Sequence, residues 1–252
     1  MLIHASYINH VGIVHFQNGE LNLLSVEFIG ELNSALTEME RDEAVHVIVL
    51  ASRKKAFCAG ANLKELLYVP EVRKTNKAPN SYDPIEDWQR LSSVEKPVIA
   101  CVEGACLGGG LEMALMCDFI VASEQATFGF PEIKLGLLPG GGGTQRITER
   151  ISMGRARELI MMGDSITARI AHEWGLVNAV FDHDECLDGA LEFAANLASK
   201  SLSSLKEIKK LLTAANIEHI KKGLVIERTA FYERLESPEA IAKINDFFDR
   251  KN

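Results

Sequence analysis

Two glutamates lie in segments whose composition suits proton transfer. Glu112 is the one charged residue in the run Gly108–Met116 (GGGLEMALM), and Glu132 follows Pro131 further along the chain. A carboxylate with few routes out of an apolar helix is expected to have a raised pKa. The three glycines at the start of this helix add exposed N–H groups and the positive end of the helix dipole, which suit an anion formed during reaction. The segment therefore indicates an enzyme.

Each glutamate also has a structural interpretation. Glu112 fits a structural acid bonded to a basic partner or a backbone amide, because ion pairs also bury acids. Glu132 fits a first-turn acid that complements a helix dipole. Asp118 ends the same apolar run and is better explained as a structural hydrogen-bond acceptor than as a catalyst. Position alone leaves both interpretations of the glutamates open.

The run Pro139–Thr144 (PGGGGT) superficially resembles a phosphate-binding loop. No lysine precedes the hydroxyl residue, so a nucleotide P-loop is rejected, and the dinucleotide-binding pattern is not met either. What remains is a tight turn whose N–H groups could line a site. The seven histidines lack ligand spacing, so no catalytic metal is expected. The five cysteines form no CxxC pattern and are predicted to be buried free thiols.

The overall composition is that of a globular protein with one main domain. The chain has 252 residues, of which 47% are hydrophobic and 25% charged. A formal net charge of -8 provides no basic surface for nucleic acid. No apolar run reaches the ~18 residues of a membrane span, and the first ten residues do not resemble a signal peptide. We expect the cytoplasm or an equivalent matrix.

Strands and helices alternate in the elements that must position these residues. Residues 12–17, 45–51, 98–105 and 118–122 are predicted strands, and a helix capped by Ser25 lies between the first two. The polar stretch 67–87 contains three prolines and is predicted to be a long loop or lid. After Gly163 the chain becomes mainly helical, with helices over 167–174, 185–198, 202–212 and 217–235 and another starting at Ser237.

Five ordered motifs cover nearly the whole chain. They are Ala56–Lys64 (AFCAGANLK), Lys96–Val98, Gly108–Asp118, Phe128–Glu132 (FGFPE) and Gly136–Arg146 (GLLPGGGGTQR). With the flanking segments Asn22–Ser25 and Gly175–Val177, this pattern resembles the crotonase, or enoyl-CoA hydratase/isomerase, superfamily.

The resemblance implies an α/β fold, a crotonase-like superhelix of repeated ββα units with a helical C-terminal trimerisation region. Residues 1–195 would form the core with the catalytic site. Residues 196–252 would pack on that core, on a neighbouring subunit, or on both. It also implies a homotrimer, or a homohexamer built as a dimer of trimers. The ligand would be an acyl-CoA thioester, with no separate cofactor.

The resemblance also implies an oxyanion hole built from the backbone N–H groups of Ala61 and Gly109. A carbonyl held by both becomes enolate-like, and such donors contribute ~3 kcal/mol each. Glu112 would take a proton from the water that attacks C3 of a trans-2-enoyl-CoA, and Glu132 would deliver a proton to C2. The N–H of Gly140 would help to position that water.

Coenzyme A is expected to bind near Ala59 and Lys64. Lys54 and Lys55 also flank the expected groove. Lys64 is equally compatible with solvated surface, and solvated surface is the favoured interpretation of Lys54 and Lys55. Residues 66–88 are expected to shape the acyl pocket. The chain departs from the family pattern at Asn62, where an aspartate is common, and its final helix lacks a glycine and a Lys-Arg-Pro ending.

Three functions compete at this stage. Hydration is favoured because both glutamates are present. A double-bond isomerase, or another enolate-forming enzyme such as a decarboxylase, could use the same oxyanion hole with Glu132 alone. A non-catalytic binding protein is the third alternative, and the net charge of -8 argues against an RNA-binding version of it.

Overall fold

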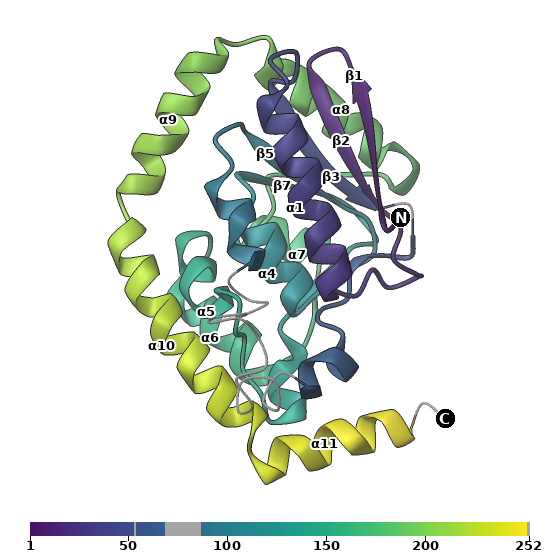
Figure 1. The fold of residues 1–252 in the computed structure, drawn as a ribbon, viewed down its shortest axis with the longest axis vertical. Coiled ribbons are helices and arrows are strands. Elements are labelled where there is room, and N and C mark those ends of the chain that lie inside the picture. Colours follow the sequence, from purple (N-terminus) through teal and green to yellow (C-terminus); the bar gives the residue numbers. More distant parts are fainter. Residues whose placement is uncertain (53, 69–86, 251–252) are drawn as a thin grey trace.

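The computed structural model describes residues 1–52, 54–68 and 87–250, and its strands form two sheets (Figure 1). The larger sheet has the order β1-β2-β3-β5-β7-β10. Its strands are β1 (Ile3–Ile8), β2 (Val11–Phe16), β3 (Val47–Ser52), β5 (Val98–Val102), β7 (Phe119–Ser123) and β10 (Ala179–Phe181). The smaller sheet consists of β4 (Ala56–Cys58), β6 (Ala105–Leu107), β8 (Thr127–Gly129) and β9 (Ile166–Thr167), in that order.

Helices surround these sheets and dominate the C-terminal part. The α-helices are α1 (Val26–Arg41), α4 (Gly109–Leu115), α5 (Gly143–Arg146), α6 (Met153–Met162), α7 (Ala168–Glu173), α8 (Cys186–Ala198), α9 (Leu202–Ala214), α10 (Ile217–Leu235) and α11 (Pro238–Asp249). Short 3-10 helices are η1 (Gln89–Ser93), η2 (Pro131–Leu135), η3 (Ile147–Glu149) and η4 (His183–Glu185). Among the described residues, no helix combines the length and apolarity needed to cross a membrane.

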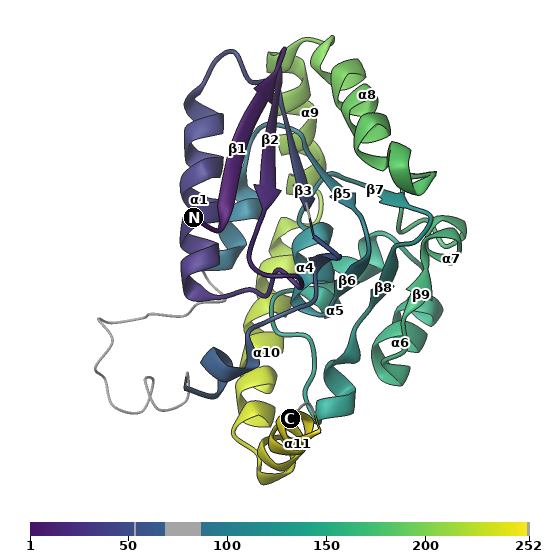
Figure 2. The same ribbon diagram turned by 90° about the vertical axis from the view of Figure 1, so that its right-hand side faces the viewer.

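The central strands β2, β3 and β5 of the larger sheet are buried on both faces, as their β-branched composition predicts. Successive strand residues point to opposite faces, so Val47 and Val49 pack toward α8, whereas Ile48 and Leu50 join the core on the side of α1. Figure 2 shows α1 and α8 on opposite sides of this sheet. Burial on both faces holds the long strands in place. The short strands β4, β6 and β8 follow β3, β5 and β7 in the chain and form the second sheet.

Helix α1 confirms the sequence prediction in detail. Ser25 caps it by accepting a hydrogen bond from the N–H of Phe28. The predicted apolar positions are the buried ones, namely Phe28, Ile29, Leu32, Ala35, Leu36 and Met39. Periodicity and capping therefore suffice to define this helix.

The chain repeats a unit of a long strand, a short strand and a helix. The units are β3-β4 with the helical residues 63–68, β5-β6 with α4, and β7-β8 with η2. The predicted continuous strand over 98–105 is therefore wrong, because Gly104 separates β5 from β6. Gly104 has φ 74°, and a side chain there would come within 1.9 Å of the Lys55 carbonyl oxygen. This bend sends β6 into the second sheet.

The C-terminal helices extend along one side of the molecule. Figure 1 shows α9 followed by α10, with α11 turning across the end. Helix α10 contacts α5. Within the described residues, α9 buries no side chain, and its Leu211 and Leu212 are 63% and 70% exposed. Most of the predicted lid, residues 69–86, lies outside the described residues.

Candidate active site

The candidate site begins at the carboxyl ends of three neighbouring short strands. β4, β6 and β8 are parallel and adjacent, with Cys106 of β6 opposite both Cys58 and Phe128. Because parallel strands end at the same edge of a sheet, the residues that follow them are brought together. These residues are Ala61 after β4, Gly109 after β6 and Glu132 after β8.

Ala61 and Gly109 both have N–H groups available for a ligand. Leu24 donates to the Gly60 carbonyl at 2.9 Å and accepts from the Asn62 N–H at 2.8 Å, so the N–H of Ala61 between them points away from Leu24. Gly109 begins α4, where N–H groups have no partner within the helix. Neither N–H has a hydrogen-bond partner among the described residues.

The two segments also lie side by side. A methyl group on Gly60 would be 3.7 Å from the nitrogen of Gly109. Gly108, which precedes α4, has φ 52°, and a side chain there would come within 2.7 Å of Glu132 Oε1. Glycine is therefore required where the helix start approaches the carboxylate.

Glu112 lies one turn into α4 and is 3% exposed. Its Oε1 accepts hydrogen bonds from the N–H of Gly141 at 2.7 Å and of Gly143 at 2.8 Å. Burial raises the pKa of Glu112 well above 4.5, the charges of Glu227 and Glu132 raise it further, and the two N–H groups oppose this shift. Oε2 has no hydrogen-bond partner among the described residues, so it is the oxygen available to a ligand.

Glu132 lies in η2 and is half-buried, with its carboxylate against the start of α4 at Gly108. Burial raises its pKa to about 8, with a smaller contribution from the charge of Glu227. Its Oε2 is buried and has no hydrogen-bond partner in the described part of the chain. The two N–H bonds favour the ionised form of Glu112, whereas burial without a bond to Oε2 in the described part of the chain favours the protonated form of Glu132. Glu132 is thus suited to donate a proton and Glu112 to accept one.

The glycine turn, Pro139–Thr144, holds Glu112 in place. Gly142 has φ 110°, and a side chain on it would come within 1.8 Å of the guanidinium of Arg146. The carbonyl of Gly141 accepts from Gln89 Nε2 at 2.9 Å and from Arg146 at 3.4 Å. The turn is therefore held through both its N–H and its C=O groups.

Sequence reasoning missed three residues that surround this turn. Glu227 of α10 is 4% exposed and bonds the turn directly. Arg146 is buried, which lowers its pKa, while the charges of Glu112 and Glu227 act in the opposite direction. Trp88 packs its ring on Gly109 and Gly141. None of the three is assigned a role by the sequence, although Arg146 ends the motif Gly136–Arg146 and Trp88 ends the segment 66–88 expected to shape the acyl pocket. Glu227 lies far along the chain from every predicted motif.

Other predicted residues lie at the margin of the site. The N–H of Ala59 donates to the Leu21 carbonyl at 2.9 Å. Lys64 is exposed, with its ammonium 5.9 Å from the centre of the Phe248 ring. Gly140 is buried beneath Phe231, and the N–H groups that reach Glu112 are those of Gly141 and Gly143. Two lysines precede β4. The Nζ of Lys54 lies 3.9 Å from Glu20 Oε1, and Lys55 is exposed.

Two structural predictions are confirmed. Asp118 accepts from the Val98 N–H at 2.7 Å and pairs with Lys209 at 2.6 Å, so it is a structural acceptor. All five cysteines are buried and free.

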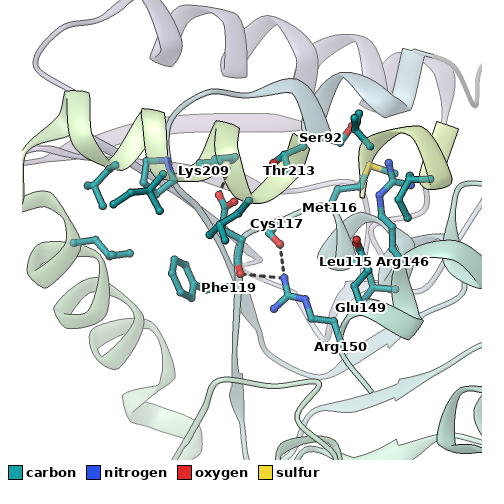
Figure 3. A pocket seen from close by; sticks show the side chains of 18 residues that line it. Ser92, Leu115, Met116, Cys117, Phe119, Arg146, Glu149, Arg150, Lys209 and Thr213 are labelled. Carbon is teal, nitrogen blue, oxygen red and sulfur yellow. Dashed lines mark hydrogen bonds and ion pairs between the residues drawn. The ribbon is translucent and has the colours of Figure 1, made fainter. Parts of the chain in front are cut away.

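A cavity of about 520 Å³ lies at the opposite end of α4, between that end and α9 (Figure 3). Its lining includes Cys117, Phe119 and Lys209, but neither Glu112 nor Glu132. Arg150 extends into the same region and donates to the carbonyl oxygens of Cys117 and Asp118. Arg150 and Lys209 at this cavity are thus hydrogen-bonded to other residues of the protein. The cavity is separate from Glu112 and Glu132.

A solved structure and a family model both match nearly the whole chain. The structure has the crotonase fold: it matches an enoyl-CoA hydratase/isomerase from Pseudoalteromonas atlantica T6c with a TM-score of 0.88 and 26% identity, covering 99% of this chain and 98% of the other. The family model for enoyl-CoA hydratase/isomerase matches residues 7–251. The chain therefore belongs to the enoyl-CoA hydratase/isomerase family.

Two curated relatives agree with this assignment. A probable enoyl-CoA hydratase of Rhizobium meliloti is 39% identical over 88% of this chain and 84% of its own length. A probable mitochondrial enoyl-CoA hydratase of Dictyostelium discoideum is 37% identical over 96% of this chain and 86% of its own. The chain thus resembles both relatives over most of their lengths.

Proposed function

We propose that the protein is an enoyl-CoA hydratase that adds water across the 2,3 double bond of a trans-2-enoyl-CoA to give a 3-hydroxyacyl-CoA. The observation that carries this proposal is the unequal bonding of two buried acids beside one helix start. Glu112 is held by two N–H groups, whereas Oε2 of Glu132 has no hydrogen-bond partner among the described residues and its pKa is raised to about 8. One acid is thereby prepared to accept a proton and the other to donate one.

The chemistry follows from these positions. The thioester oxygen accepts from the N–H groups of Ala61 and Gly109, which stabilise the negative charge that develops on it. Glu112 removes a proton from water as the oxygen of that water bonds to C3. Glu132 donates its proton to C2, and the double bond is consumed. Dehydration is the same sequence reversed. Gly140 is proposed to help position the water through its N–H.

An isomerase remains the alternative on the same oxyanion hole. Moving a double bond requires one group to carry a proton between two carbons, which Glu132 could do alone. A second carboxylate, Glu112, favours hydration, because water must also be held and deprotonated. Its Oε1 is fixed by two N–H groups, and its Oε2 has no partner within the part of the chain that the structure describes. The names of both curated relatives agree with hydration.

The direct test is to mix the purified protein with crotonyl-CoA. We expect the ultraviolet absorbance of the conjugated thioester to fall and mass spectrometry to detect a product heavier by one water. Short, long, branched and aromatic enoyl thioesters would then define the acyl preference. Unchanged absorbance with every substrate, or a product of unchanged mass, would contradict hydration, and the latter would favour isomerisation.

We further propose that Ala59 and Lys64 contact coenzyme A and that the protein forms a homotrimer or a dimer of trimers. Support for self-association comes from the exposed apolar side chains on α9 and α10, including Leu212 and Ile226 at 70% and 71% exposed. Sedimentation is expected to give three or six times the 27.8 kDa chain mass, and a monomer would contradict this. Five free cysteines favour a reducing compartment such as the cytoplasm.

A further inference from the structure

One face of α10 packs against the glycine turn, Pro139–Thr144. Gly223, Glu227 and Phe231 are spaced four residues apart, which places them on the same side of the helix. A side chain on Gly223 would come within 1.9 Å of Gln145 Oε1, and a methyl group on Gly140 would come within 2.6 Å of the Phe231 ring. The absence of a side chain at Gly223 thus lets α10 approach closely enough for Glu227 to reach the turn.

Successive N–H groups of the turn alternate between two carboxylates. Gly141 and Gly143 donate to Glu112. Gly142 donates to Glu227 Oε1 at 2.5 Å, and Thr144 donates to Glu227 Oε2 at 2.8 Å. The turn is therefore held between an acid on α4 and an acid on α10, and a shift at either acid moves the donors of the other.

The bonding pattern of Glu227 fits an ionised carboxylate. Its Oε2 also accepts from the Thr144 hydroxyl, whose oxygen in turn accepts from Gln145 Nε2 at 2.8 Å. Both carboxylate oxygens therefore act as acceptors. Burial raises the pKa of Glu227, while these bonds and the charge of Arg146 oppose the shift.

We propose that Glu227 is a positioning residue, which fixes Gly142 and Thr144 so that the alternate N–H groups hold Glu112 in its proton-accepting position. The inference rests on the proposed hydratase function. It assigns to the C-terminal helix α10 a role in the chemistry of its own chain. Glu227 acts through the turn, and no contact with the substrate is required of it.

The charge of Glu227 has a separate consequence. The charged groups that face Glu112 are Glu132 from η2, Glu227 from α10 and Arg146 from α5. Of these, Glu227 has the charge that raises the pKa of Glu112 most, after the effect of burial. Replacing Glu227 with a neutral residue of the same shape should therefore lower the pKa of Glu112.

The test is Glu227→Gln, with Glu233→Gln as the matched control on an exposed position of the same helix. We expect kcat to fall about 10- to 100-fold, because a small displacement of a catalytic group has effects of that size. KM should change by less than about threefold, since no substrate contact is lost. The acid limb of the pH profile should move to lower pH, because the charge of Glu227 raises the pKa of Glu112. Glu233→Gln should change none of these.

A second variant separates the bonds from the charge. Thr144→Val removes one hydroxyl donor and leaves the charge of Glu227, so we expect a smaller fall in kcat and an unmoved acid limb. The proposal is overturned if Glu227→Gln keeps the wild-type kcat. It is also overturned if kcat falls while the acid limb stays in place, because that result is expected if Glu227 only contributes to the packing of α10.

A measurement without turnover keeps this inference separable from the hydratase assignment. Infrared difference spectra over a pH range report the protonation of buried carboxyl groups, and Glu112→Gln identifies the band of Glu112. We expect Glu227→Gln to lower the pH at which this band titrates. If wild-type protein hydrates no enoyl thioester, the proposed function fails, and an unmoved band would overturn the role of Glu227 independently.

Discussion

Glu112→Gln is expected to lower kcat for hydration by about 10²–10⁴-fold, the range that a positioned acid or base contributes. Glutamine keeps the shape of the side chain, and its carbonyl oxygen can accept the bonds that Gly141 and Gly143 now donate to one carboxylate oxygen. The fold should therefore remain intact while the proton acceptor is lost. The measurement is the initial rate with crotonyl-CoA, together with a thermal unfolding curve.

Glu112 also determines how the rate depends on acidity. It must be ionised to accept a proton, so the wild-type rate should fall as the pH drops through its pKa, which burial raises well above 4.5. The residual rate of Glu112→Gln should lack this acid limb. Glu124→Gln, at an exposed position between β7 and β8, is the control. Near-normal turnover by Glu112→Gln would refute the role assigned to Glu112.

Glu132→Gln is expected to reduce hydration by a similar factor of about 10²–10⁴, because the Glu132 carboxylate lies against Gly108 at the start of α4, where it is proposed to protonate C2. Glutamine resembles the protonated, uncharged side chain, and Oε2 has no bond among the described residues to lose. The variant should therefore bind an acyl-CoA with nearly wild-type affinity. Calorimetry of binding and the crotonyl-CoA rate measure these two quantities separately.

The alkaline side of the profile tests the same residue. A proton donor must be protonated, so the wild-type kcat/KM should fall as the pH rises through about 8, the pKa to which burial raises Glu132. The residual rate of Glu132→Gln should not show that decline. If the decline persists in the variant, another group donates the proton.

The two variants also separate hydration from isomerisation. If the wild-type protein moves a double bond from the 3,4 to the 2,3 position, Glu112→Gln should retain this reaction, since Glu132 alone can carry the proton. Glu132→Gln should lose it. Equal loss of isomerisation in both variants would contradict the division of roles between the two acids.

Local sequence signals are sufficient for some of the regular elements, whereas β1 and α6 are not predicted. Helix α1 follows from the cap at Ser25 and its apolar period, and α10 has the predicted limits Ile217–Leu235. The break between β5 and β6 was missed because the apolar run is continuous in sequence. The structure shows why a glycine is needed at this turn: Gly104 lies so close to the Lys55 carbonyl that a side chain would clash with it.

The site was only partly predictable. The burial of Glu112 follows from its apolar neighbours, and the resemblance to a family pointed to Ala61, Gly109 and Glu132. Glu227 had no such signal, because a glutamate on a long helix normally faces solvent. Its burial depends on packing between α10 and a turn more than eighty residues away in sequence, for which the chain itself gives no local pattern.

The central claim is that two N–H groups and two glutamates surround one thioester. A crystal structure with acetoacetyl-CoA, which resembles the product but cannot be dehydrated, tests it most directly. We predict the thioester oxygen about 2.7–3.1 Å from the nitrogens of both Ala61 and Gly109, with Glu112 beside C3 and Glu132 beside C2. A thioester bound elsewhere, or one reached by only one of these N–H groups, would contradict the account.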